Sequence, residues 1–142
     1  MISLRKSKGL AAIEMLIVLP VLLLLLGAIV EIGRMFIHYT TLNKALQNGA
    51  RSAVSETYGT ERLSAIASDD DIQHIVVYGN TMSATETTLP GLKTSDISIA
   101  TTADYVTVSA NYNYSPIFTT IPIIGGAFNV TMKASSIMRT SP

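Results

Sequence analysis

The sequence predicts an α+β protein in which one long N-terminal helix crosses a membrane and then packs on a small three-stranded antiparallel sheet. Three observations lead to this prediction. An uncharged apolar run fills residues 15–30, a stripe of small residues continues after it at helical spacing, and three segments near the C-terminus alternate between apolar and polar residues. The 142 residues suffice for one domain.

The apolar run predicts a single transmembrane helix over residues 10–37. Residues 15–30 alone would span ~24 Å at ~1.5 Å per residue. Extension to Leu10 and Ile37 makes the helix long enough to cross a ~30 Å hydrocarbon core. Basic residues at positions 5, 6 and 8 precede the run and favour a cytoplasmic N-terminus with an exported C-terminal part. Glu31 and Arg34 then mark the membrane exit.

Two simple interpretations of this segment do not fit the sequence. A cleaved secretory signal would need a small-residue cleavage site after the run, and Glu31 to Arg34 offers none. A plain uncleaved anchor does not account for Glu14, because a carboxylate within an apolar segment costs a few kcal/mol without a partner. Pro20 removes one helical hydrogen bond and predicts a kink, which is either passive or linked to assembly.

A third interpretation accounts for Glu14. The stretch Lys8-Gly9-Leu10-Ala11-Ala12-Ile13-Glu14 resembles the leader motif of prepilins. The resemblance implies that residues 1–9 are a cytoplasmic leader, which a prepilin peptidase removes by cutting between Gly9 and Leu10. It also implies that Glu14 pairs with the N-terminal amine of a neighbouring subunit. The alternative is that Glu14 lies at the level of the lipid headgroups.

The residues after the run make the resemblance more specific. Glu31-Ile32-Gly33-Arg34, followed by Tyr39 and a small-residue segment ending in Ala50-Arg51, is similar to the TadE-like family over roughly residues 4–56. This family comprises minor pilins or pseudopilins of the tight-adherence (Flp-type) type IV pilus. One departure is Met15, where such proteins tend to have tyrosine.

The resemblance implies a pilin-like fold and a non-catalytic role in pilus assembly, adhesion and biofilm formation. The implied location is the bacterial inner membrane, with a periplasmic domain, or the pilus itself. The implied partners are the prepilin peptidase, a major pilin, another TadE-like minor pilin, the inner-membrane assembly platform with its secretion ATPase, and membrane lipid.

Residues 38–56 are expected to continue the helix, which ends near Gly59. Its apolar stripe is either the spine of a domain core or part of a subunit interface. The stripe recurs every three or four residues and comprises Leu42, Ala45, Leu46, Gly49, Ala50, Ala53 and Val54.

The exported domain is predicted over residues 57–142. Short helices are expected over 61–67 and after Asp69 to Asp71, whose charges suit a helix N-terminus. Strands are expected around 97–99, 106–114 and 128–134, with Thr102 to Asp104 as a hairpin turn. Between the last two strands lies an apolar loop, which either folds over the core or contacts a partner or a membrane surface. This candidate interface loop comprises Ile117, Phe118, Ile121, Ile123 and Ile124.

Composition argues against other classes of function. No cysteine is present, the net charge is zero, and no basic stripe supports nucleic-acid binding. His38 and His74 lack acids at ligand spacing, so we predict no metal, no cofactor and no catalytic residue. The main alternative is an uncleaved single-pass anchor with an exported ligand-binding domain. An enzyme with a site around His74 or Asp69 to Asp71 is a more distant one.

Overall fold

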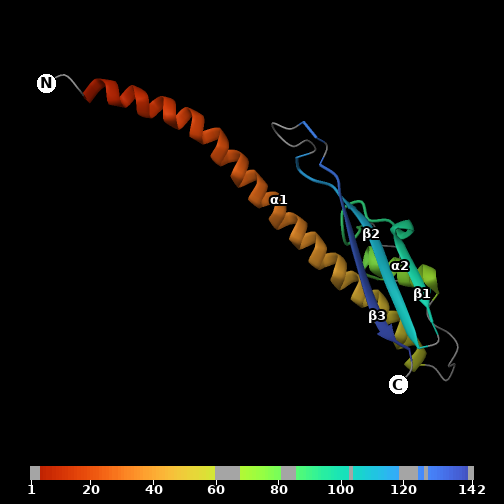
Figure 1. Cartoon of the computed structure of the whole chain (residues 1–142). Helices are drawn as coiled ribbons and strands as arrows, with labels where there is room; N and C mark the ends of the chain where they lie inside the picture. The colour runs from red at the N-terminus through yellow and green to blue at the C-terminus, as the bar shows by residue number, and fades with distance from the viewer. Residues whose placement is uncertain are drawn as a thin grey trace.

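A computed structural model describes residues 4–59, 68–80, 86–102, 104–118, 125–126 and 128–140. It has a single long helix, α1 (Leu4–Gly59), whose C-terminal half lies against a three-stranded sheet and a second helix (Figure 1). The predicted α+β fold class, with a long N-terminal apolar helix and a three-stranded antiparallel sheet, is therefore confirmed.

Helix α1 has two parts with different surroundings. Its N-terminal half extends away from the rest of the chain, and the helix bows along its length (Figure 1). The α-helix is continuous through Pro20. Within the described residues, α1 is the one helix long and apolar enough to cross a membrane. None of its most apolar stretch is buried against other described residues. This surface favours an apolar environment, which the described residues do not supply.

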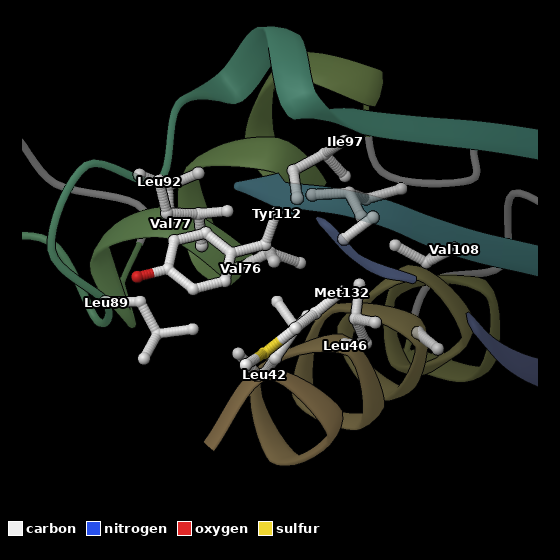
Figure 2. Close-up of a cluster of buried hydrophobic side chains, with 14 of the residues drawn as sticks. Leu42, Leu46, Val76, Val77, Leu89, Leu92, Ile97, Val108, Tyr112 and Met132 are labelled. Carbon is white, nitrogen blue, oxygen red and sulfur yellow. The ribbon is translucent and has the colours of Figure 1, made fainter. Parts of the chain in front are cut away.

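The C-terminal half of α1 supplies one wall of the hydrophobic core. All seven residues of the predicted small-residue stripe are buried. Figure 2 shows how Leu42 and Leu46 of α1 face Val108, Tyr112 and Met132 of the sheet. The stripe is therefore the spine of the core, and the small side chains allow the sheet and a second helix to approach α1 closely.

The sheet has the strand order β1-β2-β3, all antiparallel. Its strands are β1 (Ile97–Thr101), β2 (Tyr105–Tyr114) and β3 (Val130–Arg139), and a 3₁₀ turn η1 (Thr94–Asp96) precedes β1. In β2 the side chains at alternate positions from Val106 to Tyr114 are buried against the core, as their period of two predicts. β2 ends, and β3 begins, at the end of the sheet nearer the N-terminal half of α1 (Figure 1).

Helix α2 (Asp69–Tyr78) packs beside α1 and reaches β1. Ser68 caps it: its hydroxyl accepts from the Asp71 amide at 3.2 Å and donates to the Asp71 carboxylate at 2.7 Å. The three aspartates are exposed in the first turn, where they favour the helix dipole. Gly79 ends the helix at a φ of 78°. The other expected short helix, over 61–67, lies outside the described residues.

Gly49 lies directly against α2, which leads to a first prediction. A Cβ on Gly49 would overlap Cγ2 of Val76, a side chain with no exposed surface, and would lie 3.6 Å from the Ile72 carbonyl oxygen. We expect Gly49→Leu to lower the free energy of unfolding of the domain that α2 and the sheet form on α1 by about 2–3 kcal/mol through overpacking. Thermal unfolding of the detergent-solubilised chain, followed by circular dichroism, measures this.

Gly33→Leu is the matched control for that substitution. Gly33 lies in the same helix, and nothing approaches within 4 Å of a Cβ built there. Its replacement should leave the domain as stable as the wild type or slightly more so, because leucine is a better helix former. Equal melting temperatures for the two variants would show that the Gly49 contact does not limit helix packing.

Candidate functional site

A buried polar group with several hydrogen-bond partners is the carboxylate of Glu31, midway along α1. Glu31 is only 5% exposed. The Tyr114 hydroxyl, at the end of β2, donates to its Oε1 at 2.6 Å. The backbone amide of Ile117 donates to both oxygens, at 3.3 Å and 3.2 Å. Charge-assisted bonds of this kind are about twice as strong as neutral ones, and they offset the cost of burying the carboxylate.

Further along the same face of α1, Arg34 and His38 extend the network. The Arg34 guanidinium lies over the Tyr114 ring, 5.9 Å from its centroid. The His38 ring meets the Tyr114 ring edge-on at 5.1 Å between centroids. His38 Nδ1 is 3.2 Å from the Tyr112 hydroxyl oxygen. We call these five residues, Glu31, Arg34, His38, Tyr112 and Tyr114, the Glu31 seam.

The hydrogen-bond directions in the seam follow from counting protons. The Tyr112 hydroxyl has one proton, which it donates to the Pro90 carbonyl oxygen at 2.9 Å. Its oxygen is then free to accept, so His38 Nδ1 carries the hydrogen in the bond to Tyr112. The seam thus joins α1 to β2 and, through Tyr112, to the turn at Pro90.

Burial raises the pKa of both tyrosine hydroxyls, so that each keeps its proton and can donate a hydrogen bond. Burial raises the pKa of Tyr114 to about 12, and the hydrogen bond to the Glu31 carboxylate contributes to that rise, against the opposing effect of Arg34. Burial also raises the pKa of Tyr112. Both phenols therefore stay protonated at neutral pH, and Tyr114 remains a donor to Glu31.

The spacing of the seam residues explains why they meet. Glu31, Arg34 and His38 are three and four residues apart and share one helical face. Tyr112 and Tyr114 are two apart and point to the same side of β2. One stripe of the helix thus faces one side of a strand end, where the seam fastens the sheet to α1.

The chain after β2 continues along α1 toward its N-terminus. The Ile117 amide is fixed to Glu31, and the Phe118 ring lies next to Gly27, where its Cζ would be 3.2 Å from an added Cβ. Ile117 and Phe118 remain about half exposed, at 54% and 45%. Between this segment and α1 lies an apolar groove of about 750 Å³, which is lined by Pro20, Leu23, Gly27, Met35, Phe118 and Phe128 among others.

The structure describes two residues of the predicted interface loop, Ile117 and Phe118. Ile117 and Phe118 do not fold over the domain core but lie against α1, on the side of the core nearer the N-terminus of the helix. The remaining members, Ile121, Ile123 and Ile124, lie outside the described residues.

The residues assigned to leader cleavage and assembly lie far from the seam. Gly9, Leu10 and Glu14 are exposed on the free half of α1. Glu14 has no hydrogen-bond or ion-pair partner among the described residues. Seventeen positions separate Glu14 from Glu31, or ~25 Å along a helix. The structure thus brings Glu31 and Arg34 together with β2 and with Ile117 of the predicted interface loop, and leaves Gly9, Leu10 and Glu14 apart.

The partners of Glu31 were missed in the sequence. Tyr112 and Tyr114 belong to the apolar face of a predicted strand, so their period of two indicates core residues and not ligands of a carboxylate. The sequence position of His38 bears only on metal binding, for which it lacks acids at ligand spacing. The one available signal was an acid and a base three residues apart on the helix, with hydroxyl-bearing apolar residues ending a strand.

The alternative site around His74 gains no further polar groups. The His74 ring stacks on Tyr78 at 5.2 Å between centroids, and its buried Nδ1 has no partner among the described residues. Within that part of the chain, no three His, Cys, Asp or Glu side chains are placed to hold a metal ion.

Comparison with known proteins agrees with the N-terminal resemblance. Residues 9–51 match the family model described as TadE-like protein. The matched segment runs from Gly9, through the apolar half of α1 and the helical seam residues, to Arg51. This segment is therefore TadE-like, and the match covers less than a third of the chain. No curated protein and no solved structure matches the chain.

Proposed function

We propose that this chain, with its TadE-like N-terminal segment, is a non-catalytic minor pilin or pseudopilin of a tight-adherence pilus system. The observation that carries the proposal is the family match over residues 9–51, which begins at Gly9 and includes Glu14. In the proposed pathway a prepilin peptidase cuts between Gly9 and Leu10, and the mature helix stays in the inner membrane until assembly. The exported domain then takes part in pilus assembly, adhesion and biofilm formation.

The shape of α1 supports this proposal. Its N-terminal half presents an apolar surface that the rest of the described chain leaves largely exposed, while the sheet and α2 pack on its C-terminal half (Figure 1). Such a helix can lie in a lipid bilayer first and pack against neighbouring helices later, since both environments are apolar. The partners we propose are the major pilin, a second TadE-like protein, and the assembly platform with its ATPase.

The surroundings of Gly9 suit a peptidase substrate. Gly9 is exposed, and nothing lies within 4 Å of a Cβ built there. The bond after it lies in α1, so cleavage requires local unwinding of the helix. Glycine lowers the cost of that step, because it is less favourable than alanine in a helix by about 1 kcal/mol.

Glu14 supports the assembly role. It lies in the apolar half of α1 without a partner among the described residues, so its charge calls for one from outside the chain. The amine of Leu10 on a neighbouring processed subunit has the right charge. Pairing would offset the cost of burying both groups between packed helices.

Intact-mass analysis of the membrane-extracted protein, with and without a co-expressed prepilin peptidase, tests the proposal. We expect the loss of Met1 to Gly9 only when the peptidase is present. A Gly9→Val variant is the matched control, because the space around Gly9 accommodates a side chain while the peptidase signal is removed. It should keep its full mass under both conditions.

An unprocessed wild-type mass beside a peptidase that cleaves a known prepilin would overturn the proposal. The better account would then be the alternative, a single-pass anchor that carries a ligand-binding domain.

A further inference from the structure

The segment of Ile117 and Phe118 lies beside the part of α1 that is predicted to cross the membrane. Glu31 fixes the Ile117 amide at its own level, and Phe118 lies beside Gly27, four residues nearer the N-terminus. At ~1.5 Å per residue, Phe118 sits ~6 Å below Glu31 along the helix. The exported domain thus extends down the apolar half of α1 to the level of Gly27.

The domain also defines where the hydrocarbon core ends. Since Glu31 is buried between α1 and β2, the sheet already covers one face of the helix at that residue. The stretch below it, residues 10–30, has a length of ~31 Å, which matches a ~30 Å hydrocarbon core. Placing the outer boundary near Val30 puts Gly27, and Phe118 beside it, inside the apolar region.

The chemistry of the segment after β2 fits that position. No charged residue occurs between Asp104 and Lys133. Ile117 and Phe118 expose about half of their surface, and Phe118 and Phe128 form the wall of the groove opposite α1. The Ile117 amide is satisfied by Glu31, as a backbone donor at the edge of a bilayer requires.

We propose that Ile117 and Phe118 insert into the outer leaflet of the bilayer, and that a lipid acyl chain occupies the groove between Phe118 and α1. The helical wall of the groove, from Pro20 to Ala28, is continuous with the exposed apolar surface of α1 that would face lipid. Lipid is therefore the occupant already in contact with the groove. This inference does not depend on leader cleavage or on pilus assembly.

Insertion of Ile117 and Phe118 would limit how far the domain can tilt relative to the membrane. The seam holds the sheet to α1 at Glu31, and a second apolar contact ~6 Å lower, in lipid, resists tilting of the domain about the helix. Lipid would thus fix the height and orientation of the exported domain on the membrane surface.

Tryptophan fluorescence in lipid tests the inference, because the chain has no tryptophan of its own. The full chain carrying Phe118→Trp is reconstituted into phosphatidylcholine vesicles whose acyl chains are brominated near the headgroup or near the methyl end. We expect blue-shifted emission that is quenched most by the label near the headgroup and little by aqueous acrylamide.

Tyr105→Trp is the matched control. Tyr105 is about half exposed, like Phe118, but lies at the opposite end of β2, where it pairs with Arg139 of β3. A tryptophan there should emit at long wavelength, respond to acrylamide and ignore the brominated lipids. Circular dichroism confirms that each variant is folded, and Ile117→Trp replaces Phe118→Trp if the latter is not.

Two results would overturn the inference. If the Phe118→Trp variant responds to both quenchers like Tyr105→Trp, the segment lies in water. If brominated lipid quenches Phe118→Trp only after the protein is strongly diluted in lipid, a second copy of the chain fills the groove at working density. Quenching that is independent of protein density supports lipid as the occupant. None of these results bears on leader processing, which the mass measurement addresses separately.

Discussion

Glu31→Ala is expected to lower the free energy that holds the sheet to α1 by about 2–4 kcal/mol. The substitution removes the acceptor of the Tyr114 hydroxyl and of the Ile117 amide. Tyr114 is 3% exposed, so its hydroxyl would be left buried without a partner. Hydrogen bonds to charged groups contribute about 1.5–3 kcal/mol, and an orphaned buried polar group costs about 1–3 kcal/mol.

Hydrogen exchange is the sharpest readout of this loss, because one of the donors is a backbone amide. In the wild type the Ile117 amide should be protected, since it donates to both carboxylate oxygens. In Glu31→Ala it should exchange far faster, by about two orders of magnitude for a local loss near 3 kcal/mol. Amides in the middle of β2, such as that of Val108, should change less.

A double-mutant cycle with Tyr114→Phe separates the hydroxyl bond from the rest of the seam. Tyr114→Phe should destabilise the wild type by about 1–2 kcal/mol and the Glu31→Ala variant hardly at all, because its partner is already gone. Glu31→Gln should fall between, since an amide oxygen still accepts from Tyr114. Additive effects of the two substitutions would contradict the contact.

The fold was predictable where periodicity directly reports burial. The stripe from Leu42 to Val54 recurs at helical spacing because one face of α1 packs on the sheet, and all of it is buried. In β2 the alternation from Val106 to Tyr114 marks the core face for the same reason.

The seam was not predictable, because it depends on the register between elements far apart in the chain. Glu31 and Tyr114 are separated by 83 positions, and their contact requires β2 to end level with one turn of α1. Periodicity classifies Tyr114 as a core residue, which it is, but does not reveal that its hydroxyl satisfies a buried carboxylate. The expectation that Glu31 marks a membrane exit concerns its position along the helix and contains no information about its partners.

Glu31 and Glu14 illustrate two solutions to one physical problem. Both are carboxylates on a helix with a long apolar half, and each needs a partner in its surroundings. Glu31 has two donors within the chain, so its carboxylate is satisfied without a partner from outside. Glu14 has none among the described residues, which is why we propose that its partner belongs to another subunit.

Glu14→Ala is accordingly expected to block assembly while leaving the subunit intact. If Glu14 pairs with the Leu10 amine of a neighbour, its removal strands a buried amine. Breaking one side of a buried charge pair costs about 3–5 kcal/mol, which corresponds to roughly a hundredfold or greater loss in association with neighbouring subunits. Co-purification of the tagged chain with the other pilins, from cells expressing the whole system, measures this.

Met15→Ala is the matched control, because Met15 is the adjacent exposed residue and carries no charge. It should co-purify like the wild type, and both variants should be processed by the peptidase and should fold, since neither position contacts the domain. An uncleaved anchor leads to the opposite expectation: Glu14→Ala would then insert more readily into the membrane, because a costly charge is gone, and would associate as before. Undiminished co-purification of Glu14→Ala, with normal processing, would therefore separate leader cleavage from charge pairing and assign Glu14 to the headgroup region alone.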